Sequence, residues 1–283
     1  MAAAWDGAPT RAEKRQQIRR ALLVPDTLPA LEAEQYGQFE IAPGVTAERV
    51  TKSDTEKVAS LRPAESDLSK ILKTQSKSLQ SVVTPVLGHI DAIHRVPALP
   101  PIPVVREGSE VTPGAYEYIK SSGRPVKIGV QPDSMTPRLT FAHEVWHFIE
   151  HQGIGTIGAY ETETDPRLRF ILGAARNTDT ARYLKTLAGR KVWPVDFADA
   201  SRANNVIDRT YVEYLLQPRE LLARGYAQYV AFKSGDPAMT EELAAIRWRP
   251  SRGIYYPEQW EDREFGSVAG AFDRAILELG WQK

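Results

Sequence analysis

The chain has 283 residues, 42% of them hydrophobic and 25% charged, a composition typical of a globular protein with a sizeable core. Thirty-six basic residues balance thirty-six acidic ones, so no net charge indicates nucleic acid or a membrane surface as a partner. The absence of cysteine excludes disulfides and thiolate metal sites. A transition metal would therefore need imidazole and carboxylate ligands.

The N-terminus carries no apolar core of signal-peptide length before its charges begin, and no stretch approaches about 18 uncharged apolar residues. We therefore expect a protein without a membrane span that starts in the cytoplasm. Residues 10–24 are predicted to form a charged helix, which is either solvated or an arm that docks on a partner. Residues 26–54 are expected to be irregular, with short strands such as FEIA and VTAERV.

Apolar residues recur at spacings of three and four between Ser66 and Arg95, which predicts an amphipathic helix kinked at Pro85. The following PALPPIPVV is interpreted as a stiff connector, because each proline fixes its own φ and restrains its neighbour. We take this connector as a domain boundary. It separates an N-terminal helical and extended segment, residues 1–98, from a second domain, residues 99–283.

The second domain is predicted to open with a β-hairpin, in which YEYIK and PVKIGV are joined by the turn-forming SSGR. A helix follows. Thr136 suits its N-cap and Pro137 its first position, where a missing N–H costs nothing. The helix RLTFAHEVWHFIEHQ is expected to stop at Gly153.

Further helices are predicted to begin at Asp165-Pro166, at Asp179 and at Pro218, with a short helix over residues 238–247 and an amphipathic helix in the tail GSVAGAFDRAILELGW. The predicted fold is therefore α+β and mainly helical, with a small β-sheet just before the helix that carries HEVWH.

HEVWH occupies residues 143–147. Side chains four apart share one face of a helix, so the imidazoles of His143 and His147 can converge on one zinc ion. Glu144 would then lie beside a metal-bound water rather than on the metal, placed to take the proton of that water as it attacks a carbonyl.

Three of the five histidines lie within nine residues of this helix, namely His143, His147 and His151. The alternative interpretation is a polar stripe on a surface helix, or histidines whose partners lie in the core. The other two, His89 and His94, are five apart, a spacing that suits no helical metal pair, and we interpret them as ordinary.

The third ligand must come from elsewhere, because ligands at four-residue steps on a straight helix spread over about 12 Å. That argument assigns His151 to the surroundings of the site or to the surface. Glu220 is the preferred ligand, since a glutamate in the first turn of an otherwise apolar helix needs a partner, and a cation is a good one. A carboxylate that only interacts with the helix dipole, or ligation by Glu213 or another acid, remain as alternatives.

Other groups could assist. Glu150 lies two turns after His143 and could accept a proton from a ligand imidazole, or could be an exposed helical glutamate. Donors for a developing oxyanion are sought on either side of Glu220, and Tyr214 is preferred among Tyr211, Tyr214 and Arg224. Each of these is otherwise a core or surface residue.

The stretches TFAHEVWHFIEHQGIG, YVEYLLQPRELLARGYAQYVAFKSGD and YYPEQWEDREFGSVAGAFDRAILELGW resemble the metallopeptidase-like domain of phage and prophage head-morphogenesis (minor head) proteins. The resemblance covers roughly residues 100–283. It implies a zincin-like domain with His143, His147 and Glu220 as zinc ligands and Glu144 as base. Members commonly have glycine before the second histidine, where Trp146 is expected to make the helix bulkier near the metal. HExxH followed by a glutamate on a later helix is also similar to gluzincin peptidases.

Two main hypotheses follow. In the first, the chain is a zinc metalloendopeptidase acting on a protein or peptide substrate during virion assembly. In the second, it is a structural minor head protein with a non-catalytic metal site and with phage capsid or portal proteins as partners, located in the host cytoplasm or the virion. A secreted toxin or effector fits the site, but not the missing signal sequence.

Overall fold

The computed structural model describes residues 67–109, 112–189, 209–247, 249–251 and 254–283. The chain divides into two compact units, Met1–Ala59 and Ser60–Lys283, and every described residue belongs to the second. The helix expected at residues 10–24 and the strands FEIA and VTAERV lie outside the described residues. No helix among the described residues is long and apolar enough to cross a bilayer.

The unit contains one four-stranded sheet in the order β1-β2-β4-β3. Its strands are β1 (Leu72–Lys73), β2 (Ile102–Arg106), β3 (Gly114–Ile119) and β4 (Arg124–Val130). β1, β2 and β4 are parallel, and β3 pairs antiparallel with β4. The predicted hairpin is therefore confirmed, and its β3 arm forms one edge of the sheet.

The proline-rich segment is not a linker between two units. PALPPIPVV contains most of β2, which lies between β1 and β4 because Ile102 and Val104 alternate inward and are buried. The single helix predicted between Ser66 and Arg95 is α3 (Leu68–Ile71) and α4 (Lys77–Ile93), separated by β1, with Pro85 inside α4.

The HEVWH motif lies on α5 (Pro137–Gly153), which begins and ends as predicted. Thr136 is the N-cap residue, but its side chain makes no capping hydrogen bond. Glu242 of α10 (Pro237–Ile246) does this instead: its carboxylate accepts from the backbone N–H of Arg138 at 3.2 Å and of Leu139 at 2.8 Å. A carboxylate from a distant helix thus satisfies two of the unpaired donors at the start of α5.

The helices predicted to begin at Asp165-Pro166, at Asp179 and at Pro218 are α6 (Pro166–Arg176), α7 (Asp179–Ala188) and α9 (Pro218–Ser234). The tail helix α11 (Asp262–Glu278) begins before the expected GSVAG, and α8 (Arg209–Leu215) was not predicted. A short antiparallel pair, β5 (Arg249–Ser251) and β6 (Ile254–Tyr256), precedes α11. The described unit is α+β and mainly helical, as predicted.

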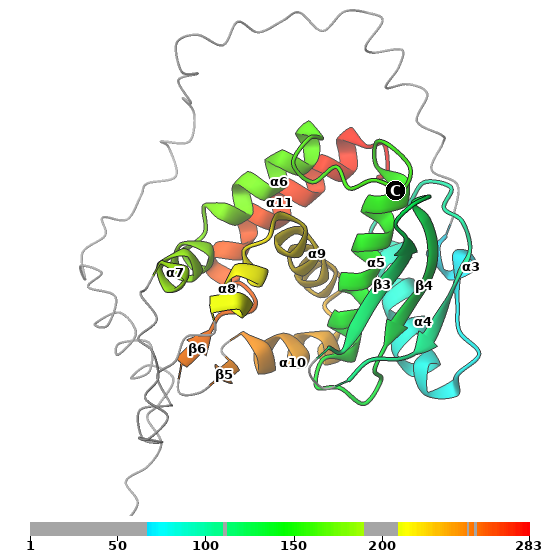
Figure 1. The fold of residues 1–283 in the computed structure, drawn as a ribbon, viewed down its shortest axis with the longest axis horizontal. Helices are drawn as coiled ribbons and strands as arrows, with labels where there is room; N and C mark the ends of the chain where they lie inside the picture. Colours follow the sequence, from blue (N-terminus) through cyan, green and yellow to red (C-terminus); the bar gives the residue numbers. More distant parts are fainter. Residues whose placement is uncertain (1–66, 110–111, 190–208, 248, 252–253) are drawn as a thin grey trace, which may run out of the picture. The chain divides into compact units, whose positions relative to one another are not determined.

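α5 lies between the sheet and α9 (Figure 1). It packs on β3 and β4 on one side and most extensively on α9 on the other, while α6 packs along α11. Both α5 and α9 are buried around most of their circumference, and α5 carries buried polar side chains as well as apolar ones: Glu144, His147, Glu150, His151 and Gln152. Each of these polar groups needs a partner inside the protein.

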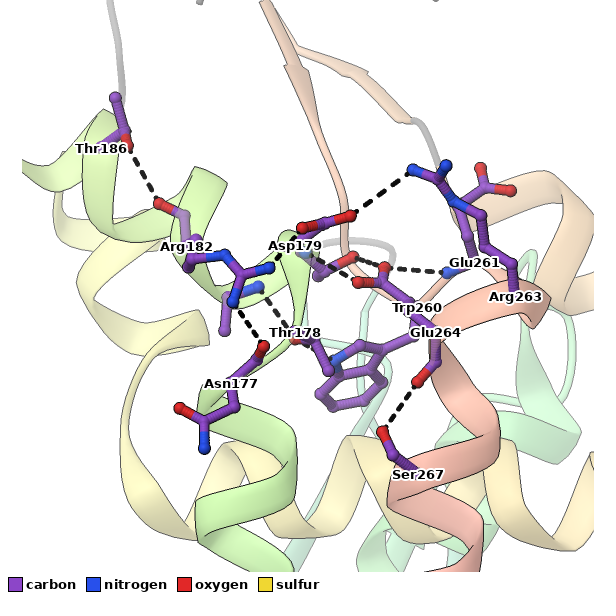
Figure 2. A network of polar contacts seen from close by, with 12 residues as sticks. Asn177, Thr178, Asp179, Arg182, Thr186, Trp260, Glu261, Arg263, Glu264 and Ser267 are labelled. Carbon is purple, nitrogen blue, oxygen red and sulfur yellow. Dashed lines mark hydrogen bonds and ion pairs between the residues drawn. The ribbon is translucent and has the colours of Figure 1, made fainter. Parts of the chain in front are cut away.

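Where α6 meets α7, a separate polar network ties these helices to the start of α11 (Figure 2). The Thr178 hydroxyl donates to the Ala175 carbonyl at 2.7 Å and accepts from the indole N–H of Trp260 at 3.0 Å. Glu264 accepts from both the backbone N–H and the hydroxyl of Thr180. This network holds together the corner at which α6, α7 and the start of α11 meet, a corner formed by residues that follow the HEVWH motif in the sequence.

Candidate metal centre

Three of the predicted ligands meet. One ligand atom from each of His143, His147 and Glu220 lies within 4.8 Å of the others. The two Nε2 atoms are 3.1 Å apart. Glu220 Oε2 lies 3.1 Å from His143 Nε2, and its Oε1 lies 3.5 Å from His147 Nε2. The chain therefore brings two imidazoles of α5 and a carboxylate of α9 to one point.

These distances fit a metal ion better than they fit hydrogen bonds. Ligand atoms at about 2.0–2.1 Å from a tetrahedral zinc ion lie about 3.3 Å from one another, close to the three separations observed. Glu220 Oε2 is buried and, although it is near His143, no hydrogen bond reaches it. A set of two imidazole nitrogens and one carboxylate is also a donor set that zinc accepts. The residues present therefore fit the metal, whose identity the geometry alone does not select.

Glu220 reaches this position because Pro218 starts α9 and leaves the glutamate in its first turn. Burial by itself would raise the pKa of Glu220, but the contacts with His143 and His147 outweigh burial and hold that pKa well below its usual range. The carboxylate is therefore ionised, as a metal ligand must be.

Glu144 lies beside the three ligand side chains and is not one of them. It is 8% exposed, and its Oε2 accepts from the backbone N–H of Tyr116 at 2.8 Å. Burial raises the pKa of Glu144 to about 7, with a further rise from the charge of Glu220 and an opposing effect of His147. A cation would favour the ionised form. This carboxylate can hold or release a proton near neutral pH.

The strand β3 passes close to Glu144. A Cβ atom placed on Gly114 would lie 2.5 Å from Thr140 Cγ2 and 3.1 Å from Glu144 Cγ. Only glycine permits that approach of strand and helix without displacing Thr140. Tyr116 then places its N–H on the Glu144 carboxylate. The edge strand is thereby held against the candidate centre.

Trp146 does not lie near the metal ligands, contrary to the expectation from its place in the motif. It is 2% exposed, and its ring packs 4.7 Å from that of Tyr226 and 5.4 Å from that of Phe272. One residue before His147 on a helix points to a different face. The bulk of the indole fills the core and leaves the metal side of α5 unchanged.

Of the three residues considered as donors to a developing oxyanion, Tyr214 has the surroundings that best suit this role. Its pKa is raised above the usual value by burial and by the charges of the nearby Glu220 and Glu144. Arg224, in contrast, makes structural contacts: its guanidinium donates to the carbonyls of Glu258 and Leu215 and lies 5.3 Å from the Trp260 ring centre.

His151 is not brought to the metal ligands, as the length of the helix predicts. It is 1% exposed and its Nδ1 contacts the Tyr116 hydroxyl and the Gln152 amide, each at 2.8 Å. Because the amide N–H can only donate, Nδ1 is the acceptor and the proton sits on Nε2. The rings of Tyr118 and Tyr160 surround it at 4.2 and 4.8 Å. His151 is part of an aromatic cluster.

Glu150 is fully buried, which excludes the interpretation as an exposed helical glutamate. Its Oε1 accepts from the Thr162 hydroxyl. Burial raises the pKa of Glu150, while Thr162, His147 and Arg219 act in the opposite direction. It lies one turn beyond His147 on α5.

Sequence reasoning missed two residues that flank the centre. Tyr160 lies with its ring centre 6.1 Å from that of His147, and the guanidinium of Arg219 lies 4.5 Å above the Tyr160 ring. Tyr160 stands in an irregular segment without periodicity, so no pattern could place it. The position of Arg219, directly before Glu220, was the available signal for a cation near the site.

Compared with known protein families, characterised proteins and solved structures, the chain shows no match. The residues alone therefore define the site, a His143-His147-Glu220 group that can bind a metal ion.

Proposed function

We propose that the protein is a zinc-dependent peptidase that hydrolyses peptide bonds in a protein or peptide substrate. The observation that carries the proposal is the placement of Glu144, a buried carboxylate with a pKa of about 7, beside three converging ligand side chains. A metal site that serves only stability has no need of such a group. The resemblance to minor head proteins points to phage head proteins as the substrate class.

Zinc, when bound, would supply an open coordination position that lowers the pKa of a water and polarises a carbonyl. Glu144 would take the proton of the attacking water on a carboxylate oxygen and pass it to the leaving amine. Tyr214, near enough to Glu220 for that charge to raise its pKa, would donate to the oxygen on which negative charge develops.

The edge of the sheet supports a peptide as substrate. Among the described strands, β3 has a neighbour on one side only, β4. The Tyr116 N–H points away from β4 toward Glu144. An extended peptide that adds to the free edge of β3 would run past the carboxylate that acts on it.

Glu144→Gln tests the proposal. The purified protein with one equivalent of zinc is incubated with quenched fluorescent peptides of mixed sequence and with purified phage capsid and portal proteins. We expect cleavage by the wild type and a loss of about 10³-fold in kcat in the variant, because proton transfer by the base is removed. Zinc content is measured in both and should stay at about one per chain. Glu163→Gln, which changes an exposed carboxylate, is the matched control. Equal cleavage by wild type and Glu144→Gln would exclude the mechanism.

A structural minor head protein is the second candidate function. It is favoured by the way the ligands join α5 to α9, since a metal there would fasten the two helices that pack most extensively. In that case zinc binds and stabilises, no peptide is cleaved, and the protein copurifies with capsid or portal proteins.

A further inference from the structure

Two buried polar atoms on adjacent turns of α5 have no partner. His147 Nδ1, the nitrogen that faces away from Glu220, makes no hydrogen bond. Glu150 Oε2 makes none either, although Glu150 is completely buried and its other oxygen is held by Thr162. A buried donor or acceptor without a partner costs free energy, so each such atom in a folded protein needs an explanation.

Metal binding through Nε2 determines the tautomer of His147 and makes Nδ1 the protonated nitrogen. A neutral imidazole carries one N–H, and a ring that ligates through Nε2 has its proton on Nδ1. His147 Nδ1 then becomes a buried donor without an acceptor. Glu150 Oε2 is a buried acceptor without a donor, three residues along the same helix, where side chains are neighbours.

Two other buried atoms on α5 also have no hydrogen-bond partner, but neither is placed to bond with His147 Nδ1 or Glu150 Oε2. The Trp146 indole N–H is on the face that packs against Tyr226 and Phe272. His151 Nε2 follows Glu150 directly, and adjacent residues do not face each other on a helix. It also lies between the rings of Tyr118 and Tyr160.

We propose that Glu150 is a positioning residue of the metal centre: when the metal is bound, its Oε2 accepts the Nδ1–H of His147, a hydrogen bond that the two side chains do not make in this structure. Glu150 would then fix the tautomer and ring orientation of that ligand, and is itself oriented by the Thr162 hydroxyl. The inference rests on the proposed metal site. Glu150 touches neither metal nor substrate, and acts through His147. Such outer carboxylates raise the basicity of a ligand imidazole and restrict its rotation.

The first test measures zinc affinity by competition with a chromophoric chelator, without reference to activity. We expect Glu150→Gln to bind zinc 10- to 100-fold more weakly than wild type, because a neutral amide is a poorer acceptor. Thr162→Val, which leaves Glu150 in place but removes its anchor, should lose less, about threefold. Glu163→Gln, an exposed glutamate in the same segment, should bind as wild type does.

The second test takes its main measurement from the wild-type protein, with Glu150→Gln as a comparison. In the zinc-loaded protein labelled with ¹⁵N at histidine, the Nδ1–H of His147 should exchange slowly with water and resonate downfield, as expected for a charge-assisted hydrogen bond. In Glu150→Gln this resonance should move upfield. A merely structural role for Glu150 would leave it in place.

The outcomes separate the two proposals. If the wild type binds no zinc, the metal site fails and Glu150 loses its role with it. If the wild type binds zinc while Glu150→Gln binds it equally well, or if His147 Nδ1–H exchanges as fast as a solvent-bonded group, the metal site stands and the role of Glu150 is wrong.

Discussion

Two polar clusters in the same unit are satisfied in opposite ways. At the corner formed by α6, α7 and α11, the side chains of Thr178, Trp260 and Glu264 all have hydrogen-bond partners (Figure 2). Around the candidate metal centre, buried atoms of His147, Glu150 and Glu220 have no hydrogen-bond partner among the described residues. Both clusters connect segments that are distant in the sequence, but only at the corner do all the named side chains have hydrogen-bond partners.

The difference separates structural from functional polarity. A polar group buried for the sake of the fold is paired within the protein, because leaving it unpaired costs about 1–3 kcal/mol. At the corner, the chain supplies every donor and acceptor itself. At the centre, the unpaired Glu220 Oε2 lies beside the ligand nitrogens, where a cation would act. The other two unpaired atoms, His147 Nδ1 and Glu150 Oε2, lie behind the ligand imidazole and are explained by the hydrogen bond proposed above.

The largest effect expected from this comparison is stabilisation by zinc. At a free zinc concentration of about 1,000 times Kd, binding should add about 4 kcal/mol to the free energy of unfolding. For a unit of this size that raises Tm by about 10 °C. Thermal unfolding with excess zinc and with excess chelator measures the difference.

His147→Ala should abolish this zinc-dependent shift, because it removes a ligand. His89→Ala is the matched histidine control: His89 pairs with Asp236 at 3.0 Å, away from the centre, so the variant should keep the full shift. If zinc shifts the Tm of His147→Ala as much as that of the wild type, the unpaired atoms do not mark a metal site.

A second prediction concerns His94, a buried histidine whose two ring nitrogens both have hydrogen-bond partners. His94 is 1% exposed; its Nδ1 lies 2.6 Å from the Arg95 carbonyl and its Nε2 lies 2.7 Å from the Tyr226 hydroxyl. Since a carbonyl only accepts, Nδ1–H donates and Nε2 accepts from the tyrosine. Burial lowers the pKa of His94 to about 4, although the Arg95 carbonyl and Asp91 oppose this effect and Lys283 adds slightly to it.

Because the folded pKa lies below the ordinary value of about 6.5, the unfolded chain binds more protons between these two pH values. The contribution of neutral His94 is therefore complete above pH 6.5 and is lost as pH falls to 4, by about 3 kcal/mol. Urea unfolding in chelator should show the advantage of wild type over His94→Gln shrinking by that amount. A constant advantage across this range would contradict the assignment.

The sequence predicted those parts of the centre that depend on local spacing. HEVWH on a capped helix places His143, Glu144 and His147 without knowledge of the fold. Glu220 followed from a weaker argument, a carboxylate inside an apolar helix, and only the packing of α9 on α5 brings it to the histidines. Local periodicity contains no information about which helices meet.

The remaining features depend on segments that return from far along the chain. The N–H of Tyr116 reaches Glu144, 28 residues later, only because β3 is the edge strand. The cap of α5 comes from Glu242, about a hundred positions beyond Arg138. PALPPIPVV was interpreted as a stiff connector because each proline fixes its own φ and restrains its neighbour, yet the segment contains the buried Ile102 and Val104 of β2.

The smallest expected effect lies at the complete corner. Thr178→Val keeps the size and β-branching of the side chain but removes the acceptor of the Trp260 indole and of the Ala181 N–H, and the donor to Ala175. We expect a loss of about 2 kcal/mol of unfolding free energy, because buried groups are left unpaired. The zinc-dependent rise in Tm should be unchanged.

Thr186→Val is the control within the same helix, since its exposed hydroxyl donates only to the Arg182 carbonyl and water can replace it (Figure 2). Its cost should stay within about 0.5 kcal/mol. Urea unfolding of both variants, each with zinc and with chelator, measures the two quantities separately. If Thr178→Val weakens the response to zinc as much as it weakens the fold, the corner and the centre are one cooperative polar system. The distinction between polarity that completes the fold and polarity that awaits a ligand would then not hold in this protein.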